Sequence, residues 1–97
     1  MEKFMKKNLN VEYTVQIWKE GAQFVAHAMP LDIMSCGESQ EQASKALDEA
    51  VRLFLATADN MGTLDEILEE SGYEYSNKNW LAPLWISFEK HSAIIGT

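Results

Sequence analysis

The chain has 97 residues, 46% of them hydrophobic, and a formal net charge of −7 at pH 7. This length allows one hydrophobic core, and the composition is that of a folded globular protein rather than a disordered one. No apolar stretch approaches the roughly 20 residues that cross a bilayer, and no secretory signal pattern opens the sequence, so we expect a cytoplasmic protein without a membrane role. The lone Cys36 cannot form an intramolecular disulfide, which agrees with a reducing compartment.

The negative charge belongs to the body of the chain. Residues 38–74 contain ten acidic side chains and two basic ones, whereas Lys3, Lys6 and Lys7 cluster near the N-terminus, where we expect them to serve solubility. An acidic body repels phosphate, so direct nucleic-acid binding is not expected. The acidic residues are either a solvated helical face or a steering surface for a basic partner, and the sequence leaves both open.

Three strands are predicted in the first part of the chain. Residues 11–18 alternate apolar and polar side chains with the period of a half-buried strand. Residues 19–22 supply a turn, and residues 23–29 form the second strand of a hairpin. Pro30 ends this strand because it cannot donate a backbone hydrogen bond, and a short third strand is predicted at residues 33–36.

A long helix is predicted to begin at Ser39, because Ser39 and Gln42 fit a capping box. Apolar residues then recur at three- and four-residue steps over about 20 residues, as on one face of a helix. They are Ala43, Ala46, Leu47, Ala50, Val51, Phe54, Ala58 and Met61. Leu53 and Leu55 lie beside this stripe, so the apolar face is wide enough to contact a neighbouring subunit as well.

The second half of the chain adds a short helix and a strand. Gly62 ends the long helix, and a second capping box at residues 63–66 predicts a short helix that stops at residues 71–72. Residues 74–79 are predicted as a polar loop, and the aromatic and β-branched residues after Pro83, up to Phe88, as a last strand.

These elements predict an α+β fold in the order β-β-β-α-α-β. The long helix packs on one face of a three-stranded antiparallel sheet, and the short helix and the C-terminal strand follow. We expect a single domain over residues 1–97, with its core at about residues 11–89 and frayed ends at residues 1–8 and 91–97.

Residues that could carry catalysis are few. The sequence has no phosphate-binding loop, no nucleophile elbow and no paired Cys or His motif, and His27 and His91 have no partner at metal-ligand spacing. Cys36 is interpreted as a buried thiol within a strand, the alternative being a nucleophile. Glu12, the only acid of the first strand, is expected to face solvent. We therefore predict that the protein is not an enzyme and that it has no catalytic residue, metal, cofactor or small-molecule substrate.

A partner is expected to contact aromatic and charged side chains. Trp18 closes the first strand on its polar side, where it either anchors an interface or caps the core. We take Trp18 together with Glu41, Asp48, Glu49 and Arg52 of the long helix as the candidate partner-binding residues.

Several stretches carry a family resemblance. They are Phe24-Val25-Ala26, the run from Pro30 to Ser39, the Ala- and Leu-rich helix from Glu41 to Leu55, and the run from Thr63 to Gly72. Together they span roughly residues 11–73 and resemble the HicB-like antitoxin family. The resemblance implies a partial RNase H-like fold without nuclease activity. It also implies that the domain neutralises a small basic RNA-cleaving toxin of the HicA type by covering its active surface. Residues 74–97 are too short and too aromatic for the C-terminal DNA-binding segment of many members.

Two functions follow as hypotheses. The first is an antitoxin-like protein that binds a HicA-type toxin directly. The alternative is a solitary HicB-like protein without a toxin, a regulatory or structural dimer or tetramer that pairs through strand edges and the wide helix face. A degenerate RNase H-like nuclease comes third, and no metal-ligand constellation supports it.

Overall fold

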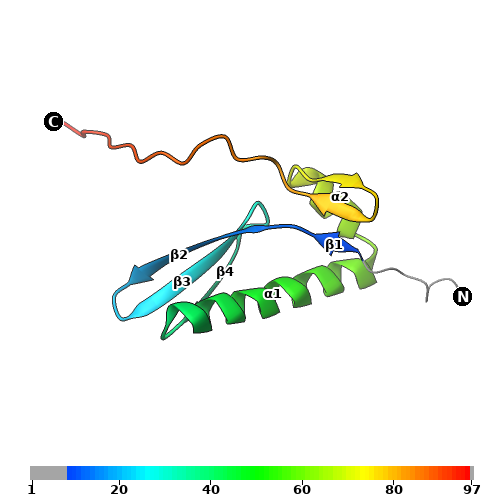
Figure 1. Ribbon diagram of the computed structural model, residues 1–97, viewed down its shortest axis with the longest axis horizontal. Coiled ribbons are helices and arrows are strands. Elements are labelled where there is room, and N and C mark those ends of the chain that lie inside the picture. Colours follow the sequence, from blue (N-terminus) through cyan, green and yellow to red (C-terminus); the bar gives the residue numbers. More distant parts are fainter. Residues whose placement is uncertain (1–8, 97) are drawn as a thin grey trace, which may run out of the picture.

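The computed structural model describes residues 9–96, and they form an α+β fold with two small sheets and two helices (Figure 1). The elements are β1 (Asn10–Val11), β2 (Thr14–Glu20), β3 (Gln23–Met29), β4 (Ile33–Gly37), α1 (Gln40–Met61), α2 (Leu64–Glu70), β5 (Glu74–Ser76) and β6 (Asn79–Leu81). Neither helix of the described part of the chain is long and apolar enough to traverse a bilayer.

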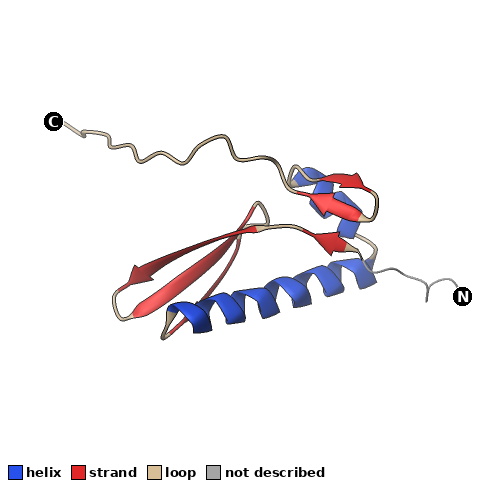
Figure 2. Cartoon of the chain, viewed as in Figure 1, coloured by secondary structure: helices blue, strands red, loops and turns tan. Residues whose placement is uncertain are grey.

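The main sheet confirms the three predicted strands. Its order is β2-β3-β4, and both pairs are antiparallel. α1 covers one face of this sheet, and within residues 9–96 no helix or strand covers the other (Figure 2). The register places Trp18, Val25 and Cys36 side by side across the three strands. Ala26 and Ala28 of β3 are buried under α1, and successive residues of a strand point to opposite faces of the sheet. Val25 and its two neighbours therefore lie on the face that α1 does not cover, which we call the open face.

The capping signals at the ends of α1 are confirmed. The Oγ of Ser39 accepts a hydrogen bond of 3.1 Å from the amide of Gln42, and the side chain of Gln42 accepts one of 3.1 Å from the amide of Glu38. Gly62 ends the helix with a φ of 76°, a left-handed conformation that glycine adopts without steric cost. Local sequence therefore fixes both ends of α1.

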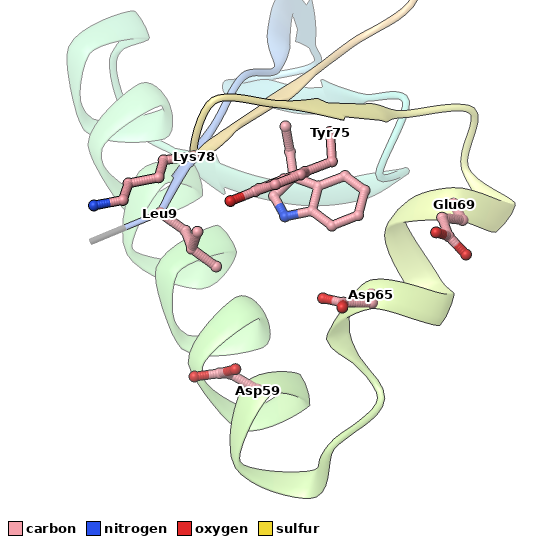
Figure 3. Close-up of a pocket in the computed structure, with 7 residues that line it drawn as sticks. Leu9, Asp59, Asp65, Glu69, Tyr75 and Lys78 are labelled. Carbon is pink, nitrogen blue, oxygen red and sulfur yellow. The ribbon is translucent and has the colours of Figure 1, made fainter. Parts of the chain in front are cut away.

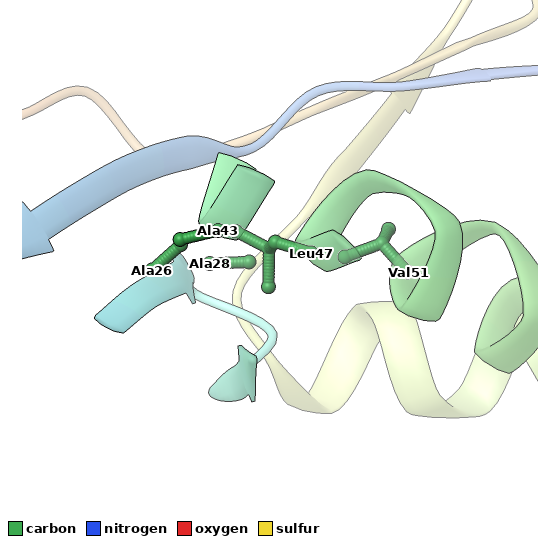
Figure 4. Close-up of a cluster of buried hydrophobic side chains, with 5 residues drawn as sticks. All are labelled: Ala26, Ala28, Ala43, Leu47 and Val51. Carbon is green, nitrogen blue, oxygen red and sulfur yellow. The ribbon is translucent and has the colours of Figure 1, made fainter. Parts of the chain in front are cut away.

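Small residues bring α1 close to the sheet. The buried cluster beneath α1 joins two strand alanines to three helix residues (Figure 4). Its members are Ala26, Ala28, Ala43, Leu47 and Val51. Gly37 at the end of β4 lies against the first turn of α1, where an added Cβ would stand 2.7 Å from the amide nitrogen of Ala43. This approach allows no larger residue at position 37.

Gly37→Ala is accordingly expected to destabilise the fold by about 1–3 kcal/mol, the usual cost of forcing an extra methyl group into a packed contact. Urea unfolding measures the loss. Gly96→Ala is the matched control, because nothing lies within 4 Å of the added Cβ there. Equal unfolding midpoints for the two variants would contradict the close packing of β4 on α1.

The predicted apolar stripe of α1 is only partly buried. Ala43, Leu47, Val51 and Ala58 are in the two cores, but Phe54 and Met61 of the same stripe are 36% and 69% exposed. The reason is length, since α1 has 22 residues, about 33 Å, and the strands beneath it have at most seven. Past the sheet, α2 and β6 pack on the side of α1 that carries Leu55 and Ala58.

The first predicted strand is interrupted. β1 pairs in parallel with β6, whereas β2 pairs with β3, so residues 12 and 13 lie between two separate sheets. The hydroxyl of Tyr73 donates a hydrogen bond to the backbone carbonyl of Glu12 at this junction. Glu12 is exposed, as expected, and its carboxylate accepts a bond of 3.3 Å from the amide of Ala82.

The second half of the chain requires two corrections. Residues 74–79 belong to a hairpin rather than a polar loop, because Asn77 and Lys78 both take positive φ (53° and 67°), the conformation of a tight two-residue turn. The strand predicted after Pro83 is wrong, since residues 82–96 contain no regular secondary structure.

The short helix α2 is confirmed, but its predicted capping box is not. Thr63 makes no side-chain cap; its hydroxyl instead donates to the carbonyl of Ala58, at 3.4 Å. α2 is held by packing, because Leu64 and Leu68 are buried against Ala58 and Trp80. Leu31 and Leu55 pack against both clusters and connect the two cores. The predicted fraying of residues 1–8 and the lysine cluster at residues 3–7 lie outside the described residues.

Candidate functional site: an acid-lined cavity

A cavity of about 560 Å³ lies where the end of α1, α2 and the β5–β6 hairpin meet (Figure 3). Its size is within the range of ordinary ligand sites. The residues that line it are Leu9, Asp59, Asp65, Glu69, Tyr75, Lys78 and Trp80, and we call it the acid-lined cavity.

Two helices supply its three carboxylates. Asp59 comes from the last turns of α1, and Asp65 and Glu69 are four residues apart, so they share one face of α2. Lys78, at the turn of the hairpin, is the only basic residue of the lining. Among residues 9–96, the ion pairs within 4 Å are His27 with Asp32 and His91 with Glu89, so none of the cavity carboxylates is neutralised there. The cavity therefore attracts positive charge.

The inner wall of the cavity contains a hydrogen-bond donor without a partner. Trp80 is 4% exposed, and its indole Nε1 is buried with no acceptor. The ring of Tyr75 packs beside it, with the ring centroids 5.1 Å apart. A buried donor left unpaired costs about 1–3 kcal/mol.

Within the described residues, no group of three or more His, Cys, Asp or Glu side chains is placed to hold a metal ion. Both histidines make ordinary polar contacts: His27 Nε2 lies 2.7 Å from Asp32 Oδ1, and His91 Nε2 lies 2.7 Å from Glu89 Oε1. The absence of catalytic function remains a prediction.

The residues predicted to bind a partner fall on different surfaces. Glu41 and Asp48 line a shallow depression beside Ile17, and Arg52 and Glu49 are exposed on α1. Asp48 also has a structural contact, because its carboxylate accepts a 2.6 Å hydrogen bond from Tyr13.

Trp18 lies apart from these residues, on the open face of the sheet. It is 38% exposed, its indole donates to Glu20 at 2.9 Å, and its ring meets that of His27 edge to face. It does not cap the core. Cys36 on the same face is exposed, so its prediction as a buried thiol was wrong: strand β4 has a helix on only one side.

Sequence reasoning missed the acid-lined cavity. The spacing of Asp65 and Glu69 on one helix face was a signal that could have found half of it. The burial of Trp80 could not be inferred, because the prediction placed a loop up to residue 79 and the strand only after Pro83.

Two tyrosines with raised pKa values lie at the junction between the two sheets, so the stability of the junction depends on pH. Burial raises the pKa of Tyr13 to about 12, and its hydrogen bond to Asp48 and the negative charge there add to the effect. Burial, followed by the charge of Glu12, raises the pKa of Tyr73 to about 12. The neutral phenols are therefore favoured in the folded state.

We expect the free energy of unfolding to fall as pH rises from about 10 to about 12, because unfolded tyrosines lose their protons near 10 and folded ones only near 12. Below pH 10 this contribution is fully present. Tyr73→Phe should flatten the fall, whereas Tyr75→Phe, at a half-exposed ring, should leave it unchanged. Urea unfolding at intervals from pH 9 to 12 measures this, and identical pH profiles for the wild type and Tyr73→Phe would contradict it.

Comparisons with known proteins found no match: no family model, no curated protein and no solved structure matches the chain.

Proposed function

We propose that this chain is a HicB-like, antitoxin-type binding protein that neutralises a small basic RNA-cleaving toxin of the HicA type by direct contact. The observation that carries the proposal is the acid-lined cavity, with three carboxylates against one lysine and an unpaired indole donor. A segment of a basic partner would place a Lys or Arg among the carboxylates.

The surroundings of the cavity support a basic partner. Of the ten acidic residues between positions 38 and 74, all except Asp48 are exposed. Their field steers the encounter with a positively charged protein, while contacts in the cavity determine how long the complex lasts. The half-exposed ring of Tyr75 adds an attraction for a cation.

The finer fold assignment belongs to the same proposal. The antiparallel β2-β3-β4 sheet followed by α1 has the element order of the partial RNase H-like fold implied by the sequence resemblance. The resemblance, which spans roughly residues 11–73, extends over this whole unit.

Co-expression tests the proposal. Any small open reading frame adjacent to this gene is induced alone and together with this chain, and growth is followed. We expect the neighbour to arrest growth and this chain to relieve the arrest. A harmless neighbour, or an arrest that this chain leaves unchanged, would overturn the proposal.

A second candidate function, a solitary homo-oligomer without a toxin, is favoured by one feature of α1. Leu53 and Met61 are each 69% exposed and Phe54 is 36% exposed, so the C-terminal half of α1 presents apolar side chains to solvent where the sheet has ended. Such side chains suit contact with another copy of the chain. Recovery of a stable homo-oligomer with no bound protein from lysate favours this candidate over the first.

A further inference from the structure

The acid-lined cavity has more negative than positive charge. Asp59, Asp65 and Glu69 stand against Lys78 alone, so two carboxylates have no counter-charge in the lining. Figure 3 shows the ammonium group of Lys78 on the opposite side of the cavity from Asp65 and Glu69, the two acids of α2. Like charges gathered in one concave site attract a cation from elsewhere.

A second observation, independent of charge, marks the same cavity as incomplete. Trp80 belongs to the lining and is 4% exposed, and its indole Nε1 is buried without an acceptor. Native proteins leave few buried polar groups unpaired. The cavity wall formed by residues 9–96 therefore lacks both a polar neighbour and positive charge.

The described chain starts in the wall of this cavity. Leu9, the first described residue, is one of the lining residues. The amide of the next residue, Asn10, donates a 3.1 Å hydrogen bond to the carbonyl of Lys78, which fixes the start of β1 beside the turn of the β5–β6 hairpin. Residues 1–8, outside the described part of the chain, are therefore attached directly at the cavity.

The attached residues contain the only cluster of lysines in the chain, at positions 3, 6 and 7, and we call residues 3–7 the lysine segment. Because one residue spans at most about 3.6 Å, Lys7 lies within about 7 Å of Leu9 and Lys6 within about 11 Å. Both ammonium groups are thus within reach of the cavity. Two lysines also match the two carboxylates that lack a counter-charge.

The covalent connection favours the lysine segment over other sources of positive charge. A group held by a short connection has an effective concentration in the millimolar range, far above that of a second copy at micromolar concentration. The C-terminal residues 82–96 do not compete, because their only formal charges, Glu89 and Lys90, cancel. The cavity therefore meets the lysine segment of its own chain before any other cation of the protein.

We propose that the lysine segment occupies the acid-lined cavity of its own chain, with Lys6 and Lys7 among the three carboxylates. A basic partner then has to displace the segment before it binds in the cavity. The measured affinity for such a partner is lowered by the fraction of molecules whose cavity is occupied. This competition rests on the proposed function, whereas the occupation of the cavity does not.

Zero-length carbodiimide coupling of the full chain, followed by peptide mass mapping, tests the occupation. We expect links from Lys6 or Lys7 to the three cavity carboxylates within one molecule, at a yield that dilution leaves unchanged. Glu70 and Glu74 are the internal control, because they are exposed and lie outside the lining. Absence of links to the cavity, equal linkage to the two control residues, or links that disappear on dilution would overturn the proposal.

A synthetic peptide with the sequence of residues 1–8 probes the cavity by titration. It should bind Lys6→Gln/Lys7→Gln at least about threefold more tightly than the wild type, because the cavity of this variant is vacant. Lys19→Gln/Lys90→Gln removes the same charge at exposed positions outside the lining, and it should bind the peptide as the wild type does. Equal affinity of the wild type and Lys6→Gln/Lys7→Gln for the peptide would contradict the occupation.

Both measurements need no toxin, so they separate this proposal from the antitoxin function. If the adjacent gene product proves harmless, the links and the peptide affinities are expected unchanged. If no link to the cavity forms, the antitoxin function still stands on its own test. With an active toxin, Lys6→Gln/Lys7→Gln should bind it at least about threefold more tightly than the wild type, and equal or weaker binding would overturn the competition.

Discussion

Asp59→Lys/Glu69→Lys is expected to weaken binding of the proposed toxin partner by about 100-fold, or about 2.7 kcal/mol. Both carboxylates line the acid-lined cavity, and their reversal places like charges opposite an incoming Lys or Arg. The fold should tolerate the change, because Asp59 and Glu69 are exposed and lie near the C-terminal ends of α1 and α2, where cations are favourable. Isothermal titration with the purified product of the adjacent small open reading frame measures the affinity.

A matched control separates the cavity from total charge. Glu70→Lys/Glu74→Lys changes the net charge by the same amount at exposed positions outside the cavity lining. We expect it to slow association modestly and to weaken the affinity by less than about tenfold. If the two double variants weaken the affinity by the same factor, long-range attraction alone binds the partner and the cavity has no specific role.

Leu47→Ala is expected to lower the free energy of unfolding by about 2–5 kcal/mol, a large part of the roughly 5–15 kcal/mol that holds a domain together. Leu47 is fully buried at the centre of the cluster between α1 and the sheet. Its alanine neighbours cannot fill the space because they have no side-chain freedom, so a cavity remains. Urea unfolding followed by circular dichroism measures the loss.

The control for Leu47→Ala is Leu53→Ala, the same chemical change at a side chain that is 69% exposed. It should alter the free energy of unfolding by no more than about 0.5 kcal/mol at protein concentrations where the chain is monomeric. Equal losses for the two variants would contradict the orientation of α1 on the sheet.

Prediction from sequence succeeded where local chemistry determines structure. Ser39 and Gln42 define the start of α1, Gly62 its end and Pro30 the end of β3, since each signal acts within a few residues. The alternation predicted for residues 11–18 likewise placed Val15 and Ile17 on the face toward the helix. These features need no knowledge of distant contacts.

It failed where distant segments decide the outcome. Trp80 is buried because β6 pairs with β1, almost 70 residues earlier in the chain, and no local pattern announces that pairing. Phe54 and Met61 are exposed because the sheet ends before α1 does. The acid-lined cavity lies where α1, α2 and the β5–β6 hairpin meet, and the hairpin was not predicted. The sequence therefore indicated the acidic charge of the cavity but not its position.

The most direct test of the central claim is a titration of RNA cleavage. Purified product of the adjacent small open reading frame is incubated with RNA while this chain is added in increasing amounts. If the chain is an antitoxin-type inhibitor, cleavage stops near one copy of this chain per toxin, and Asp59→Lys/Glu69→Lys fails to stop it at the same ratio. Cleavage that continues in excess of this chain, or RNA cleavage by this chain itself, would contradict the account.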